Sequence, residues 1–194
     1  MSTPIVRLED LVHIYQGVTL KRYENELGSQ EQIINSRNLE QIYISGELSS
    51  SQLDSFNLFK YRLQTDDVVI TIRGTPLKAS VVKDEVKGCL PNQNLAILRV
   101  KEKNLNSVYL AVLMRSKWLE KELSTLYSQS IGTQLLKISQ LRELEIPLPS
   151  LDRQNQLAQL FLAAEQYTQI TLDALEARNN LTQLIFSQIL EGEQ

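Results

Sequence analysis

The sequence predicts an α+β fold, in which a globular domain of mixed β-sheet and helix over residues 1–149 is followed by one long helix over residues 150–190. Strand-like and helix-like segments of the first part do not alternate regularly, which disfavours a doubly wound parallel sheet. Pro147 and Pro149 then force an extended segment, and neither glycine nor proline follows until Gly192. The second part is therefore expected to be one uninterrupted helix.

Several short segments of the first part have the composition of strands. Residues 67–72 are β-rich and end at the turn signature of residues 73–76, and residues 78–82 return, so the two segments predict a hairpin. A polar turn over residues 91–94 precedes another expected strand over residues 95–100. We also expect strands over residues 6–12 and 33–44, whose patterns alternate, and over the short apolar segment of residues 143–148.

Two segments are expected to be helical. Ser107 is a candidate N-cap for a helix to about residue 126, and its leucines recur at three- and four-residue spacing. Ser150 is a good N-cap for the long helix, and Asp152 places a negative charge in its first turn. At 1.5 Å per residue, a helix of about 40 residues is ~60 Å long, which exceeds the size of a small domain.

The long helix carries more than one apolar stripe, which suggests two neighbours, its own domain and a partner helix in a coiled coil. A helix folded back on its own domain is the alternative. The residues expected to contact a second copy or a partner are Leu157, Phe161, Ala164, Leu175, Leu181, Ile185 and Ile189.

Composition excludes several functional classes. The first residues lack the features of a signal peptide, and the apolar runs are too short to span a membrane, so we expect a cytoplasmic protein. One cysteine, Cys89, and one histidine, His13, exclude a disulfide framework and a Cys/His zinc site within one chain. Motifs for phosphate binding or nucleophilic catalysis are missing, and the adjacent Asp66 and Asp67 would point to opposite faces of a strand. The chain is therefore not expected to be an enzyme.

Charge is distributed unevenly along the chain. Residues 1–150 contain 18 Lys and Arg and 17 Asp and Glu, a net charge of +1, whereas residues 151–194 contain 2 and 6, a net charge of −4. The acidic balance therefore belongs to the long helix. A near-neutral domain can still bind DNA if its cations lie on one face.

Taken together, the segments resemble the DNA-specificity subunit of type I restriction–modification systems. The matching stretches are residues 8–17, 67–82, 91–97, 108–116 and 128–161. The ending Ile189-Leu190-Glu191-Gly192-Glu193 is similar to the family's closing motif. The most specific part is the junction Ile146-Pro147-Leu148-Pro149 with Gln154 downstream. The usual subunit has two recognition domains and two long helices, whereas this chain has room for one of each and resembles a half-size form.

The resemblance implies a non-catalytic subunit that recognises double-stranded DNA. It implies a homodimer that pairs through the long helices, and a two-fold dimer predicts a palindromic, bipartite target. The expected partners are a methyltransferase subunit, which would bind S-adenosylmethionine, and a restriction subunit with translocase and nuclease activity. No cofactor is expected in this chain itself.

The candidate DNA contacts lie in polar loops. Arg pairs with guanine and Asn or Gln with adenine, while Lys, Ser and Thr suit phosphates. The candidates are Lys21, Arg22, Arg73, Thr75, Lys78, Gln93, Asn94, Gln129, Ser130, Thr133, Gln134 and Lys137. Each of these loops can instead be a purely structural turn. Two other functions remain open, an oligomerisation module without a DNA role and a small DNA-processing enzyme, which the missing motifs disfavour.

Overall fold

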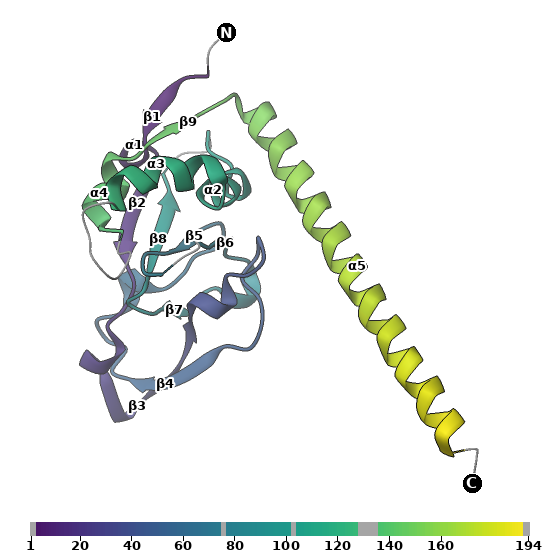
Figure 1. The fold of residues 1–194 in the computed structure, drawn as a ribbon. Helices are drawn as coiled ribbons and strands as arrows, with labels where there is room; N and C mark the ends of the chain where they lie inside the picture. The colour runs from purple at the N-terminus through teal and green to yellow at the C-terminus, as the bar shows by residue number, and fades with distance from the viewer. Residues whose placement is uncertain (1–2, 75–76, 102–103, 128–135, 192–194) are drawn as a thin grey trace. The chain divides into compact units, whose positions relative to one another are not determined.

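The computed structural model describes residues 3–74, 77–101, 104–127 and 136–191, with side chains left out for residues 124–127. The chain divides into two compact units, Met1–Ala158 and Gln159–Gln194. Strands and short helices make up the first unit, and the second consists of the rest of one long helix (Figure 1). The α+β fold class with a long C-terminal helix is therefore confirmed.

A four-stranded antiparallel sheet forms the centre of the first unit. Its strand order is β2 (Val12–Gln16), β8 (Leu95–Val100), β5 (Val68–Thr71) and β6 (Ala79–Val81). The expected hairpin is confirmed, because β5 and β6 pair directly with Val69 opposite Ser80. The apolar helix α2 (Ser107–Met114) packs on β5 and β6. Val68, Val69, Ile70 and the first four residues of β8 are all buried, as expected for a sheet covered on both faces.

A second sheet has the order β4 (Ser49–Leu53), β3 (Glu24–Ile34) and β7 (Leu90–Pro91). Strands β3 and β4 are antiparallel, and their register shifts between Glu24 and Ser29. This sheet has its own core, which contains Ile33, Leu53 and Leu58. Short 3-10 helices η1 (Leu20–Arg22), η2 (Ser36–Asn38), η3 (Phe59–Tyr61) and η4 (Asp84–Val86) connect the strands.

The N-terminal strand pairs with the segment that leads to the long helix. Strand β1 (Ile5–Arg7) is antiparallel to β9 (Glu145–Pro147), and the short helices α1 (Leu8–Leu11) and α4 (Ile138–Glu143) pack against each other beside them. Residues 145–147 confirm the strand expected over 143–148. The N-terminal strand and the segment just before the long helix therefore lie side by side in one small sheet (Figure 1).

Three sequence-based expectations were wrong in detail. Residues 6–12 are not one strand, because α1 interrupts them; Leu8 and Leu11 are both buried. Only Ile33 and Ile34 of residues 33–44 belong to a strand, and η2 follows. Ser107 is not the N-cap of its helix. Asn106 is, since its side-chain Oδ1 accepts a hydrogen bond from the Tyr109 amide at 2.9 Å.

The helix expected over residues 107–126 is two helices. Helix α2 ends at Met114, the helix is interrupted at Arg115 and Ser116, and α3 (Lys117–Tyr127) begins after them. The Ser116 hydroxyl accepts a hydrogen bond from the Leu119 amide and so caps α3. The regular spacing of leucines hid this break because Leu119 and Leu123 of α3 are buried like the leucines of α2.

The long helix α5 (Leu151–Glu191) begins where Ser150 accepts a hydrogen bond from the Arg153 amide at 3.4 Å, which confirms the expected N-cap. Its first turns belong to the globular unit, where Gln154 and Ala158 are buried. The side chain of Gln154 accepts a hydrogen bond from the Asn106 amide and donates to the carbonyls of Asn104 and Pro149. One buried amide group thus joins the proline segment, α5 and the start of α2.

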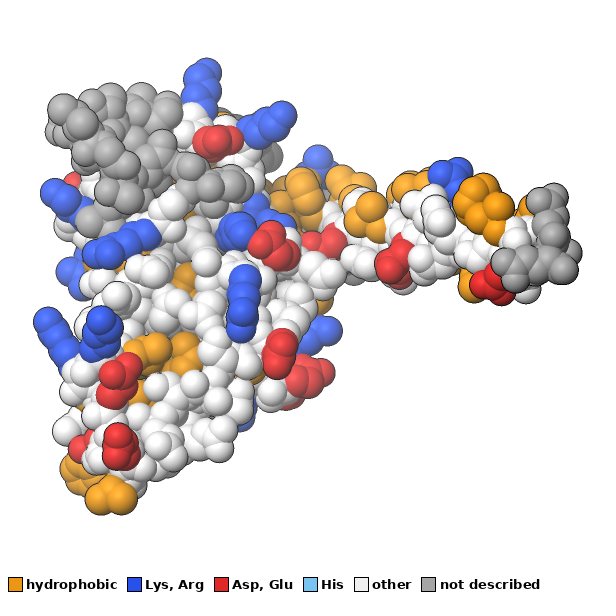
Figure 2. Space-filling model, turned by 60° about the horizontal axis from the view of Figure 1, so that its bottom comes forward, with side chains coloured by type: hydrophobic (Ala, Val, Ile, Leu, Met, Phe, Trp, Pro, Cys, Tyr) orange, Lys and Arg blue, Asp and Glu red, His pale blue; other side chains and the backbone are white. Residues whose placement is uncertain are grey.

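From Gln159 onward, α5 forms the second unit, and its side chains are nearly all exposed in the single chain. Large apolar side chains occur along its whole length, as Figure 2 shows for one face. Phe161, Leu175, Leu181, Ile185 and Ile189 of the expected contact stripe are between 42% and 58% exposed. Ala164 is also exposed, whereas Leu157 lies in the first unit and is half-buried.

Candidate nucleic-acid interface

Several of the loops singled out from the sequence emerge at one end of the four-stranded sheet. Strands β2 and β5 end there, and β6 and β8 begin there, because neighbouring strands are antiparallel. Arg73 follows β5, Lys78 precedes β6, and Gln93 and Asn94 precede β8. Lys21 and Arg22 lie on η1, which follows β2. The fold therefore gathers residues that are widely separated in the sequence.

Backbone hydrogen bonds fix these loops to one another. The Ile72 amide donates to the carbonyl of Asn94 at 2.8 Å, and the Leu136 amide donates to the carbonyl of Ile72 at 2.9 Å. The Gly17 amide donates to the carbonyl of Leu95 at 2.8 Å. Three loops and the end of β2 are thus joined by main-chain contacts.

The side chains at this sheet end differ in availability. Arg73 and Gln93 are exposed, and Asn94 is half-buried in a turn where its amide donates to the Asn92 side chain. Lys78 is paired with Glu40, so its charge is already compensated. Of these four candidates, Arg73 and Gln93 are the side chains best placed to contact a ligand.

The remaining candidates fall into two groups. Lys21 and Arg22 are both exposed, and Lys137 is exposed at the N-cap of α4, one residue after Leu136. Thr75, Gln129, Ser130, Thr133 and Gln134 lie outside the described residues.

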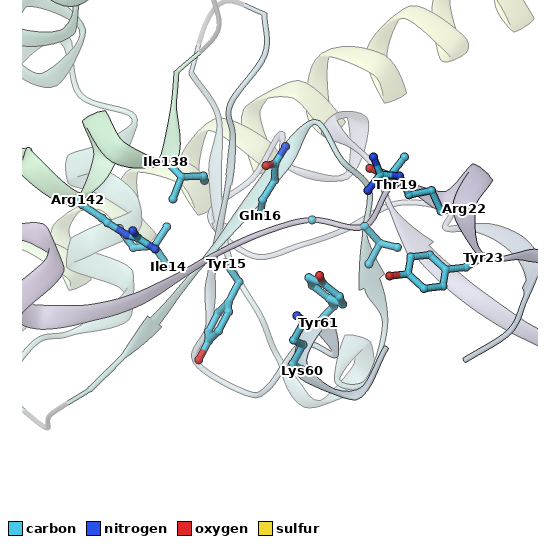
Figure 3. Close-up of a pocket in the computed structure, with 12 residues that line it drawn as sticks. Ile14, Tyr15, Gln16, Thr19, Arg22, Tyr23, Lys60, Tyr61, Ile138 and Arg142 are labelled. Carbon is cyan, nitrogen blue, oxygen red and sulfur yellow. The ribbon is translucent and has the colours of Figure 1, made fainter. Parts of the chain in front are cut away.

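A polar pocket of about 520 Å³ opens between η1, η3, α4 and the end of β2. Arg22 is the member of the candidate list that lines it. Figure 3 shows Ile138 and Arg142 of α4 at one side and Arg22 and Tyr23 at the other, with Tyr15, Lys60 and Tyr61 between them. Lys60 and Arg142 also line the pocket but were not among the DNA contacts predicted from the sequence. The adjacent Lys60 and Tyr61 could have indicated the site, because a cation beside an aromatic ring suits nucleic acid.

Two arginines at first sight available for DNA are structural. Arg99 binds Asp67 through two hydrogen bonds of 2.9 and 2.8 Å and lies 5.5 Å from the ring centroid of Tyr15. Hydrogen bonding to Asp67 raises the pKa of the Arg99 guanidinium, so it stays charged. Arg62 binds Glu31 in the same bidentate way at 2.9 and 2.7 Å. These two pairs hold neighbouring segments together rather than face outward.

The surface around these loops is mixed in charge. Figure 2 shows Lys and Arg side chains at many points of one face of the globular unit, with Asp and Glu between them. The far end of the β3–β4 ribbon is different, because Glu24, Glu26 and Asp54 flank the almost fully exposed Leu27 and Phe56. Carboxylates repel phosphates, so that end does not suit a DNA backbone.

The described part of the chain also lacks two other kinds of feature. Within it, no three His, Cys, Asp or Glu side chains come together in a way that would hold a metal ion. None of its helices is apolar enough over sufficient length to cross a membrane.

Comparison with known proteins gives a consistent result. Residues 4–182 match the family described as the type I restriction modification DNA specificity domain. The chain is 25% identical over 144 residues to the EcoBI type I restriction enzyme specificity subunit of Escherichia coli, covering 68% of this chain and 28% of that subunit.

Solved structures show the same fold. The HsdS subunit of Thermoanaerobacter tengcongensis has a TM-score of 0.55 and 20% identity over 90% of this chain and 39% of its own. A chain from a structure on complex assembly and conformational transition of the type I R-M system has a TM-score of 0.67 and 20% identity over 93% of this chain and 43% of its own. This chain therefore spans less than half the length of each of these relatives.

Proposed function

The chain belongs to the family of type I restriction modification DNA specificity domains, and on that premise we propose that it recognises a specific sequence in double-stranded DNA. The observation that carries the proposal is the family match over residues 4–182, which includes nearly all of the globular unit and most of α5. The convergence of polar loops at one end of the sheet supports it independently, because DNA readers need several donors and acceptors on one face.

In the proposed interface, the exposed Arg73 and Gln93 read base edges, and Lys21, Arg22 and Lys137 contact the backbone. A guanidinium binds the two acceptors of guanine, and a carboxamide binds the acceptor and donor of adenine. Thr75, Gln129, Ser130, Thr133 and Gln134 remain part of the proposal. Asn94 and Lys78 keep a place at its edge, although the ion pair of Lys78 with Glu40 weakens that role.

The chain is proposed to act without catalysing a reaction itself. Its role is to direct a methyltransferase subunit, which carries S-adenosylmethionine, and a restriction subunit to the recognised site. This division of labour places the recognition domain in residues 1–149 and the partner-binding helix in residues 150–190. The proposal also places the protein in the cytoplasm with the DNA that it would read.

We further propose that two copies pair through α5 as a coiled coil. The exposed apolar side chains of α5 support this, since leaving so many in water is costly for a helix that has few charges to solubilise it. A two-fold pair presents two identical recognition domains, so its target would be palindromic and bipartite. One chain with one domain would then do what a longer chain does with two.

The first experiment is to co-express the chain with a type I methyltransferase subunit from the same organism and to map methylated bases in the host DNA. A palindromic motif of two short half-sites with a fixed gap is the expected result. Co-expression with the Arg73→Ala variant should lose or change the motif. Soluble, co-purifying proteins that methylate no motif would count against DNA recognition.

The exposed apolar side chains of α5 also favour a second function, an oligomerisation module with no DNA role. This alternative predicts a dimer whose behaviour does not change when Arg73 and Gln93 are replaced. It also predicts no salt-dependent affinity for duplex DNA. Measuring DNA binding of the purified dimer at two salt concentrations separates the two functions.

A further inference from the structure

The pocket beside η1 gathers three cations from distant parts of the sequence. Arg22 comes from η1, Lys60 from η3 and Arg142 from α4. None of the twelve residues that line it is an Asp or a Glu. The rest of the lining includes the Gln16 amide, the Thr19 hydroxyl and three tyrosines, together with Gly17 and the aliphatic side chains of Ile14, Val18 and Ile138.

These cations lack carboxylate partners in the described part of the chain. Ion pairs do form elsewhere in that part of the chain, for example between Arg62 and Glu31 and between Arg99 and Asp67. Lys60 lies over the ring of Tyr61, 4.9 Å from its centroid, which holds the ammonium at the pocket without neutralising it. Like charges that share a pocket repel one another, and an anion between them removes that cost.

The floor of the pocket is preformed. Gly17 lies so close to the neighbouring loop that a Cβ atom there would be 2.0 Å from the Asn92 carbonyl oxygen. The Val18 amide donates to the carbonyl of Pro91 at 2.8 Å. Since Gly17, Val18 and Thr19 line the pocket, its wall is held by backbone contacts and pays little entropy when a ligand binds.

We propose that this pocket binds one phosphodiester group of the DNA backbone and thereby sets the position of the domain on the duplex. Arg22 and Arg142 donate to the phosphate oxygens from opposite sides, Lys60 adds a point charge, and Gln16, Thr19 and the tyrosine hydroxyls supply further donors. Such a contact carries no sequence information but fixes the register in which the sheet-end loops meet the bases. This inference rests on the proposed function and assigns Lys60 and Arg142 to it.

The test removes charge from the pocket by substitution and, separately, from single phosphates of the DNA. The variant is Lys60→Gln/Arg142→Gln, and both residues are exposed, so the fold should persist, which thermal unfolding checks. Its matched control is Lys83→Gln/Lys87→Gln, which removes the same charge from exposed positions after β6, at the opposite end of the sheet. The chain is assayed in complex with its methyltransferase, on duplexes in which single phosphates are replaced by methylphosphonates.

The expected result is a loss of affinity of roughly tenfold for wild type when one phosphate in each half-site is neutralised, as for other charge-assisted contacts. In the pocket variant, neutralising that same phosphate should have no further effect. The slope of log affinity against log salt should fall by about one per recognition domain in the pocket variant, equally for target and scrambled duplexes. The control variant should retain the phosphate effect of wild type.

Three other results have separate meanings. If wild type prefers its target and the pocket variant behaves like the control, the phosphate pocket is refuted and DNA recognition stands. If the variant weakens target binding but not scrambled binding, the pocket reads bases and the inference is wrong. If wild type shows no preference but the variant still lowers the salt slope, the pocket stands and sequence recognition fails.

Discussion

Asp67 and Arg99 form a buried ion pair between the start of β5 and β8. Asp67 is 2% exposed, and it also accepts a hydrogen bond from the Gln64 amide at 2.8 Å. The Arg99 guanidinium donates in addition to the carbonyl of Arg62 at 2.9 Å. The pair therefore joins the residue before β5 to β8, with the Asp67 carboxylate buried and the Arg99 side chain 18% exposed.

Replacing Asp67 with Ala should destabilise the domain by about 3 kcal/mol, because it leaves the mostly buried Arg99 guanidinium without its carboxylate partner. Urea unfolding followed by circular dichroism measures the loss. Glu85→Ala, at an exposed position, is the control and should change stability by about 0.5 kcal/mol or less. A small effect of Asp67→Ala would mean that Arg99 finds water or another partner.

Glu31 and Arg62 give stability that depends on pH. Hydrogen bonding to Arg62 holds the pKa of the Glu31 carboxyl below its usual value of 4.5. A lowered folded-state pKa means that the stabilisation is fully present above the unfolded-state pKa and is lost as pH falls through the folded-state pKa. Stability should therefore decline below about pH 5, by up to ~1.4 kcal/mol per pH unit from this group.

Glu31→Gln tests this assignment. The variant should be less stable than wild type at pH 7, because a neutral amide binds Arg62 more weakly. The difference in unfolding free energy between the two proteins should shrink as pH is lowered from 6 to 3, since wild type must protonate Glu31. A difference that stays constant over this range would contradict the ionic pair.

At the level of elements, the approach of β2 to the loop after β7 depends on one glycine. A side chain at Gly17 would meet the Asn92 oxygen at 2.0 Å and the Pro91 oxygen at 2.8 Å, and both are backbone atoms that cannot rotate away. Gly74 is different, since its φ of +88° is strained for other residues but its surroundings are open. Glycine is therefore required at residue 17 by lack of space and at residue 74 by backbone conformation.

Gly17→Ala should destabilise the domain by about 3 kcal/mol or more, because the sheet end must open to admit a methyl group. Gly74→Ala should cost only about 1–2 kcal/mol, the usual strain of a left-handed backbone. Thermal or urea unfolding of both variants gives the comparison. Equal losses would show that the contact between β2 and the neighbouring loop relaxes easily.

The attachment of the first turns of α5 to the globular unit depends on Gln154. This residue is fully buried, and its amide group makes three hydrogen bonds to backbone groups. Gln154→Leu leaves those groups without partners and should cost roughly 3 kcal/mol. Faster hydrogen exchange in residues 104–107 and 151–158 would show that the loss is local, and the exposed Gln156→Leu serves as the control.

The sequence predicts long, strongly marked elements better than short ones. The hairpin of β5 and β6, strand β8 and helix α5 follow from turn residues and from the absence of Gly and Pro, which are local signals. Helix α1 does not, because its four residues are held by burial of Leu8 and Leu11 against the rest of the unit. Likewise, no local pattern reveals that the backbone amide of Asn106, the N-cap of α2, is bound by Gln154, 48 residues away.

The candidate site shows the same limit. Polar loops can be recognised from Arg73, Gln93 and Lys137, but their meeting at one sheet end follows from strand order. Lys78 looked available in the sequence and is paired with Glu40, 38 residues before it. Lys60 and Arg142 gain significance only because the fold brings η3 and α4 to the same pocket.

For the whole molecule, the largest gain in stability still available is burial of the exposed apolar side chains of α5. Its residues beyond Ala158 form a separate unit with no core of their own, and a helix of this kind is marginal alone in water. Burying a large apolar side chain is worth about 1.5–3 kcal/mol, so pairing with a second helix would stabilise the unit substantially. Dimerisation and stability of α5 should therefore be coupled and should depend on protein concentration.

Leu175→Glu/Ile189→Glu places two carboxylates on the proposed contact stripe and should raise the dimer dissociation constant roughly 100-fold or more. Sedimentation equilibrium over a range of concentrations measures it. Asn180→Glu/Ser187→Glu adds the same charge to polar positions on another side of α5 and should leave the dimer intact. In the methylation assay, the monomeric variant should fail to modify the bipartite motif although its recognition domain is unchanged, because each chain supplies only one half-site. A variant that stays monomeric and still methylates the full motif would show that the partner subunits, rather than α5, bring two copies together.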